Sequence, residues 1–264
     1  YCGVKWNTTP HYVMRIVGPS GNPAGTYVWK LGEWHHWIMQ RKNGIVTGWV
    51  NGILDIGPVA YTTDADWNAF MLGGLNEAYT NTNYKWNGYM TNMRISKGIA
   101  RYGGISLRTT QQVVTSSNSD TQVVTANSTG GSGTNVLTSD SYTALLLNGD
   151  EVYGGTGTFP AVKSASLGAN TGTVLTITKG DGTTSTKYPS QRQGISAFGA
   201  NSYYFDGGDY LHVPQAQLGT TCDFGKENFT IEYWSYLTDA TSIYVWGIGK
   251  TSNAAGRLFE LFVD

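Results

Sequence analysis

Short runs of alternating hydrophobic and polar residues recur along the chain, and turn-forming residues separate them. Such alternation predicts strands that bury one face, and no segment repeats its apolar residues with a convincing helical period. In residues 86–96 the alternation runs through Tyr89, Thr91, Met93 and Ile95. The pattern predicts strands over residues 12–17, 34–41, 45–50, 53–54, 70–76, 86–96, 144–147, 174–177, 202–205, 210–213, 229–236 and 243–246, and the apolar run 258–264 is strand-like as well.

Turn chemistry supports a fold made of strands. Asn51-Gly52 lies between two apolar runs, and Lys42-Asn43-Gly44 lies between two others. Asn-Gly accepts the positive φ angles that a tight hairpin requires. The chain also has 35 glycines, and aromatic residues make up 13% of it. We therefore expect an all-β protein with many hairpins.

Charge and hydropathy exclude several classes of protein. Hydrophobic residues make up 40% of the chain, too many for a disordered protein. The formal net charge is -1, so the chain lacks the basic character of a nucleic-acid binder. No apolar run approaches the length of about 20 residues that a membrane helix needs, so no membrane insertion is expected. Charged residues are only 13%, a composition that fits a virion or extracellular surface protein.

Several motifs occur in an order that identifies a family resemblance. Residues 204–211 read YFDGGDYL and residues 229–234 read FTIEYW, while 34–41 read WHHWIMQR, 49–52 read WVNG and 86–95 read WNGYMTNMRI. Together with the leucine-rich run 144–150, these resemble concanavalin A-like, laminin-G-type domains of lectins and of phage and microbial surface proteins. The resemblance implies an antiparallel jelly-roll β-sandwich.

The two halves of that domain stand in permuted order. Residues 1–102 resemble its second half and residues 141–264 its first half. Residues 103–140 form a Ser/Thr/Gly-rich connection. The chain is either a window across a tandem array of domains or a circular permutant. In both cases we expect the N- and C-terminal segments to pack together and complete one sandwich, because an isolated half would leave an apolar face bare. Swapping between molecules would make an oligomer instead.

The sequence contains no recognisable catalytic motif. Glucanases of this fold family place carboxylates on one strand with E-x-D-x-x-E spacing, and retaining hydrolysis needs two carboxyls about 5 Å apart. Glu232 has no such partner nearby in the sequence. His35 and His36 are adjacent strand residues and point to opposite faces, so they cannot easily share a metal. We expect a protein that is not an enzyme.

Two loops have the composition of a carbohydrate site. Sugars stack on aromatic rings, and their hydroxyls form hydrogen bonds with amides and donate hydrogen bonds to carboxylates. Residues 61–68 and 79–86 combine these types, and the candidate ligand-binding residues are Asp64, Asp66, Trp67, Asn83, Tyr84 and Trp86. The alternative is that the aromatic residues among them cover sheet edges or fill the core.

Calcium is the one cofactor that the sequence suggests. The turn 206–209 places Asp206 and Asp209 around two glycines, where carboxylate and carbonyl oxygens can converge. A hairpin turn without metal is the alternative. Cys2 and Cys222 pair only if their backbones come within about 7 Å, and the sequence leaves that open.

The sequence thus predicts a lectin-like recognition or adhesion module, binding a glycan, in a virion or extracellular surface protein. The alternative is a structural decoration or fibre domain that contacts a neighbouring virion or surface protein. A glycoside hydrolase is the weakest of the three hypotheses.

Overall fold

The computed structural model describes parts of the chain. These are residues 14–16, 23–28, 30–62, 64–65, 70–73, 86–102, 141–147, 162–163, 174–175, 178–179, 190–193, 195–197, 201–207, 211–213, 223–238, 243–249 and 257–263. They form strands and turns and contain no helix, so none of them makes a helical membrane span.

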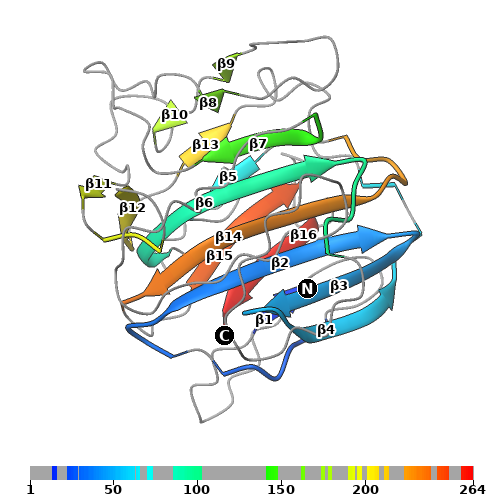
Figure 1. The fold of residues 1–264 in the computed structure, drawn as a ribbon, viewed down its shortest axis with the longest axis horizontal. Helices are drawn as coiled ribbons and strands as arrows, with labels where there is room; N and C mark the ends of the chain where they lie inside the picture. The colour runs from blue at the N-terminus through cyan, green and yellow to red at the C-terminus, as the bar shows by residue number, and fades with distance from the viewer. Residues whose placement is uncertain are drawn as a thin grey trace.

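The larger sheet is antiparallel throughout, and seven strands lie along it in the spatial order β11-β12-β6-β14-β2-β3-β4 (Figure 1). An eighth strand, β7 (Thr143–Leu147), pairs with residues 93–96 of β6, beyond the part of β6 that pairs with β12. The seven are β11 (Ser190–Gln193), β12 (Asn201–Asp206), β6 (Asn87–Lys97), β14 (Phe229–Leu237), β2 (Trp34–Lys42), β3 (Ile45–Val50) and β4 (Ile53–Ala60).

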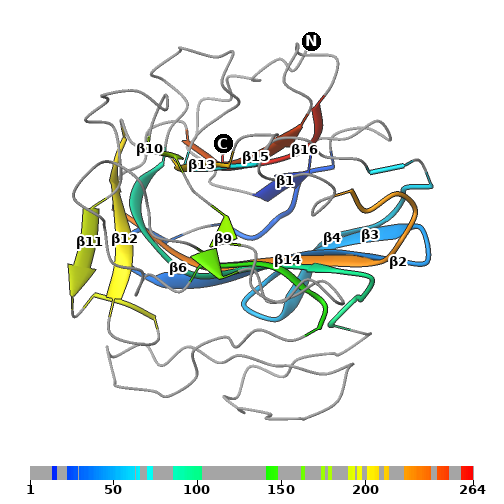
Figure 2. The ribbon, with the colours of Figure 1, turned by 90° about the horizontal axis from the view of Figure 1, so that it is seen from above.

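A second sheet lies over the first, and Figure 2 shows the two as separate layers. Its strands, in spatial order, are β1 (Met14–Ile16), β16 (Arg257–Val263), β15 (Ile243–Gly249), β5 (Phe70–Leu72), β13 (Leu211–Val213) and β10 (Thr178–Lys179). β8 (Val162–Lys163) pairs with β9 (Val174–Leu175). The all-β fold class is confirmed, and the arrangement is sandwich-like.

Strands from the two ends of the chain alternate within the larger sheet. β14, from residues 141–264, pairs with β2 on one side and with β6 on the other, and both partners come from residues 1–102. β12 then pairs with the outer edge of β6. The second sheet is also mixed, because β1 pairs with β16 and β5 pairs with β13 and β15. Each segment therefore supplies the neighbours that the other one needs.

The main hydrophobic core lies on one face of the larger sheet. It includes Trp37 of β2, Tyr233 of β14 and Phe205 of β12, and Leu72 of the second sheet belongs to the same cluster. The rings of Trp37 and Tyr233 stack with their centroids 6.1 Å apart. We call this the core face of the sheet and the opposite one its outer face.

A β-bulge interrupts β6 and corrects the predicted alternation. Asn92 has a φ of 50°, and the pairing of β6 with β14 shifts between Glu232 and Trp234. Met90 and Met93, three residues apart, both belong to the core. Tyr89 and Thr91 therefore lie on the outer face, whereas Met93 and Ile95 lie on the core face. The prediction that all four share one face is wrong, because the extra residue reverses the alternation.

Strand positions otherwise follow the hydrophobic pattern closely. Within the predicted run 174–177, β9 covers Val174–Leu175, and β4 continues to Ala60, well beyond the predicted 53–54. The pattern does not predict β8 or β11. β11 reads Ser-Gln-Arg-Gln and has no apolar residue, so only its pairing with β12 identifies it as a strand.

Candidate functional site

The outer face of the larger sheet carries a buried polar network around Glu232. Its carboxylate accepts hydrogen bonds from Arg94 Nε at 2.7 Å and from the hydroxyl of Tyr102. Arg94 Nη2 lies 2.5 Å from the same oxygen that Nε contacts, and His36 Nε2 lies 3.5 Å from the other one. Both Glu232 and Arg94 are 0% exposed.

Electrostatics keep Glu232 ionised. Burial alone would raise its pKa, but the charge of Arg94, together with the contacts from His36 and Tyr102, outweighs burial. The pKa of Glu232 consequently falls from its usual 4.5 to about 2. The pKa of Tyr102 is raised by its burial and by the adjacent Glu232 carboxylate. Tyr102 therefore stays protonated and donates to Glu232.

The network attaches the segment that follows β6 to the sheet. Thr230 accepts from Arg101 N at 2.9 Å and donates to Ile99 O at 3.1 Å. Gln40 bonds both backbone groups of Tyr102 through its side-chain amide. Residues 99–102 thus lie over the sheet and exclude solvent from Glu232. A fully buried, paired carboxylate cannot reach a substrate, so Glu232 has a structural role.

A row of aromatic rings occupies one end of the same outer face, and we call it the aromatic row. It consists of Trp34 on β2, Tyr236 on β14, Tyr89 on β6 and Tyr204 on β12. The four residues are direct cross-strand partners on adjacent strands. Successive ring centroids are 5.5, 5.7 and 4.9 Å apart, and the rings are tilted against one another. Each ring retains part of its surface exposed.

Polar side chains lie directly beside the aromatic row, and we call them the polar row. Thr238 comes two residues after Tyr236, Asn87 two residues before Tyr89, and Asp206 two residues after Tyr204. Residues two apart along a strand point to the same side, so all three lie on the outer face with the aromatic row. Asn87 and Asp206 are register partners. The Thr238 hydroxyl donates to the side-chain oxygen of Asn87 at 3.0 Å. Thr238 and Asp206 are exposed.

The two rows together offer the groups that bind carbohydrate. Aromatic rings contact the apolar faces of sugars, and amide, hydroxyl and carboxylate groups bind the hydroxyls. Neighbouring strands are about 4.8 Å apart, so a row over four strands extends about 14 Å. That length can contact more than one ring of an extended glycan.

The structure places the predicted ligand-binding residues apart from these rows or leaves them outside the described residues. Asp64 is exposed and lies before Ala65, which exchanges backbone hydrogen bonds with the turn before β14. Trp86 is 0% exposed and belongs to the main core, so its indole packs inside the protein. The remaining four, Asp66, Trp67, Asn83 and Tyr84, lie outside the described residues.

The predicted calcium turn is only half described. Asp206 is exposed at the end of β12, whereas Asp209 lies outside the described residues, as do Cys2 and Cys222. Among the residues that are described, no three His, Cys, Asp or Glu side chains group together as a metal site would require. Calcium binding therefore stays a prediction.

Reading along the chain does not find the aromatic row, because its four members are far apart in sequence. Tyr89 is part of the alternation in 86–96, and Trp34, Tyr204 and Tyr236 are in predicted strands, but only the register brings them together. Comparison of the chain with protein-family models, curated proteins and solved structures found no match.

Proposed function

We propose that this chain is a non-enzymatic, lectin-like recognition module that binds carbohydrate through the aromatic row and the polar row. In this proposal the sheets form a concanavalin A-like jelly roll, and the module belongs to a virion or another extracellular surface protein. The observation that carries the proposal is the juxtaposition of four partly exposed rings with an amide, a hydroxyl and a carboxylate.

Among the described residues, the burial of Glu232 supports a binding role over hydrolysis. A glycosidase needs two carboxyl groups that reach the same sugar. Glu232, the acid on the central strand, is held by Arg94 and Tyr102 beneath residues 99–102. Asp206 lies at the edge of the polar row, where it can accept hydrogen bonds from sugar hydroxyls.

A glycan array, probed with and without calcium, tests the proposal. Titration of the best ligand should give affinities about two- to twelvefold weaker for Trp34→Ala and Tyr89→Ala, because an aromatic contact contributes about 0.5–1.5 kcal/mol. Trp49→Ala is the matched control, since Trp49 is a half-buried tryptophan on β3, outside the row. A blank array under both conditions, or equal losses for Trp34→Ala and Trp49→Ala, would contradict carbohydrate binding at the rows.

A structural role in protein–protein contact is the second candidate, and exposed apolar residues favour it. Leu31 is 46% exposed and Leu54 is 43% exposed. Asp55, next to Leu54, accepts hydrogen bonds from the backbone of Thr26 and Tyr27 at 2.7 and 2.8 Å, so residues 26–27 lie beside β4. Under this hypothesis Leu54→Glu weakens self-association or partner binding in sedimentation experiments and leaves glycan binding unchanged.

A further inference from the structure

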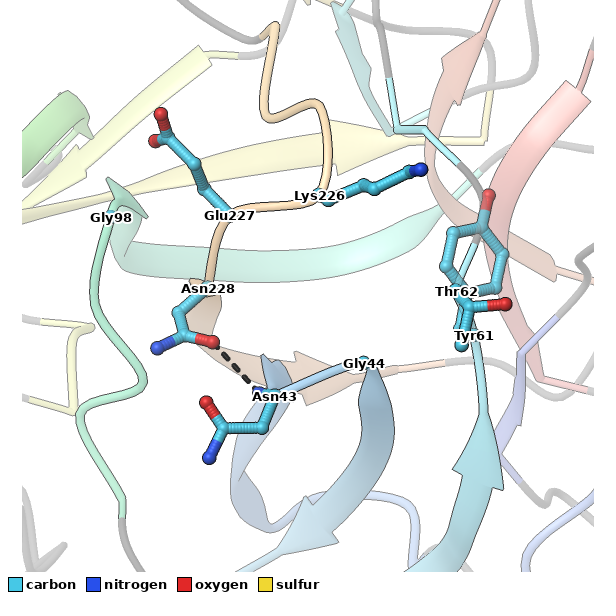
Figure 3. A pocket seen from close by; sticks show the side chains of 8 residues that line it. All are labelled: Asn43, Gly44, Tyr61, Thr62, Gly98, Lys226, Glu227 and Asn228. Carbon is cyan, nitrogen blue, oxygen red and sulfur yellow. Dashed lines mark hydrogen bonds between the residues drawn. The ribbon is translucent and has the colours of Figure 1, made fainter.

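A polar pocket lies at the other end of the strands that carry the aromatic row. Asn43 and Gly44 of the β2–β3 turn, Tyr61 and Thr62 after β4, Gly98 after β6 and residues 226–228 before β14 line it (Figure 3). The aromatic row lies at the opposite ends of β2, β6 and β14. The pocket has a volume of about 490 Å³, within the range of about 300–1,000 Å³ typical of small-molecule sites.

The floor of the pocket is held rigidly by Arg41. Its guanidinium is 0% exposed and donates to Gly225 O at 2.6 Å and to Glu227 O at 2.8 and 2.5 Å. The same guanidinium lies over the ring of Phe229, 5.1 Å from its centroid. These bonds fix the turn before β14 in place, so the side chains that it carries into the pocket are held on a fixed support.

Backbone pairing joins the other walls to this turn. Asn228 O accepts from Gly98 N at 2.8 Å, and its side-chain oxygen accepts from Asn43 N at 2.9 Å, as drawn in Figure 3. Tyr61 N donates to Gly44 O at 2.6 Å. One preorganised wall therefore forms from the β2–β3 turn, the segment after β4, the turn before β14 and the end of β6. A ligand would not have to order these segments when it binds.

Several polar groups in the pocket have no partner among the residues that the structure describes. Within the part of the chain that the structure describes, the side chains of Asn43, Thr62, Lys226 and Glu227 make no hydrogen bond or ion pair. Asn228 uses its oxygen for Asn43 N, which leaves its NH₂ group to donate elsewhere. In Figure 3 the Lys226 and Glu227 side chains extend to different sides of the pocket. Their charges cancel, so the lining has no net charge.

An aromatic ring lies beside Gly98, one of the residues that line the pocket. Tyr142 is 41% exposed, and two atoms of its ring lie 3.7 and 3.9 Å from the place where a Cβ on Gly98 would be. A carboxylate oxygen of Glu227 lies 3.9 Å from the same place. Gly98 has a φ of 81°, a conformation that favours glycine. A Cβ would lie at ordinary van der Waals distance from both groups, so the backbone angle is what favours glycine here.

We propose that this pocket is a second binding site, and that its ligand is a single neutral pyranose ring. The sugar stacks on Tyr142, its hydroxyls bond to Glu227 and to the amides of Asn43 and Asn228, and its lack of charge matches the balanced lining. The inference goes beyond the proposed function, because it assigns a site at the far end of the sheet and does not depend on the aromatic row.

Saturation-transfer NMR with the methyl glycosides of glucose, galactose, mannose and N-acetylglucosamine tests the proposal. At least one should bind saturably to the whole chain. Tyr142→Ala and Asn43→Gly should each weaken that binding about tenfold; glycine suits the φ of 51° at Asn43, so the turn is retained. Trp49→Ala, outside the pocket and the aromatic row, should leave monosaccharide binding unchanged, whereas Trp34→Ala, in the aromatic row, should weaken polysaccharide binding in affinity electrophoresis.

Three results would overturn the proposal. They are no saturable binding by any of the four glycosides, equal binding to the wild type and both pocket variants, or tighter binding of methyl glucuronide or free glycine than of the neutral sugars. The last would indicate a charged or zwitterionic ligand. If the wild type binds one of the methyl glycosides but no polysaccharide, the proposed function of the rows is contradicted and the pocket assignment stands.

Discussion

Neutralising Glu232 should destabilise the fold strongly, because Glu232→Gln leaves Arg94 charged and buried. Removing one partner of a buried ion pair costs about 3–5 kcal/mol. The Arg94 guanidinium contacts Glu232 through two nitrogens, at 2.7 and 2.5 Å, and neither side chain is exposed. We expect the free energy of unfolding at pH 7 to fall by that amount.

The loss should also depend on pH in a defined direction. The pKa of Glu232 is lowered from 4.5 to about 2 on folding, so its ionisation stabilises the protein above pH 4.5 and the benefit disappears as the pH falls toward 2. At 1.36 kcal/mol for each pKa unit, the full benefit is about 3 kcal/mol, and about 2 kcal/mol of it is lost by pH 3. Glutamine has no such titration.

Urea denaturation at pH 7, 5 and 3, followed by tryptophan fluorescence, measures both quantities. The stability difference between the wild type and Glu232→Gln should narrow by about 2 kcal/mol from pH 7 to pH 3. Glu227→Gln is the matched control, since Glu227 is exposed and should change stability by less than about 0.5 kcal/mol. A difference that stays constant with pH would refute the assignment of Glu232 as an ionised structural residue.

Two further predictions concern the core and the bulge. Trp37→Ala should lower the free energy of unfolding by about 3–5 kcal/mol in urea denaturation, because Trp37 is 1% exposed and stacks on Tyr233; a loss below 1 kcal/mol would contradict its place in the core. Asn92→Val should lower the thermal midpoint more than Asn92→Gly does, since a β-branched residue is strained at a φ of 50°. Equal midpoints would count against the bulge.

The hydrophobic pattern could predict most of the strands but not how they pair. The runs in 34–41, 45–50 and 229–236 are long enough to be recognised, and β2, β3 and β14 lie there. β11 could not be recognised, because its stability as a strand comes from pairing with β12 rather than from apolar residues. The bulge at Asn92 was also hidden, since asparagine in an alternating run does not by itself indicate a positive φ.

The candidate site was less predictable than the fold. Composition directed attention to the loops 61–68 and 79–86, where aromatic and amide residues are neighbours in sequence. The aromatic row joins Trp34, Tyr236, Tyr89 and Tyr204 across four strands, and a one-residue shift in any pairing would turn a ring to the core face. The polar pocket at the opposite end of these strands likewise depends on Gly98 lying next to Tyr142 and Glu227, and this proximity arises only in the folded chain.

The aromatic row exists only if strands from the two ends of the chain alternate, since β2 and β6 come from one segment and β14 and β12 from the other. Cutting the chain at a protease sequence inserted within residues 103–140 tests this directly. Native mass spectrometry of the fully cleaved protein should find both fragments in one particle with the mass of the intact chain. Two separate folded fragments would contradict the interleaved sheet and the binding surface built on it.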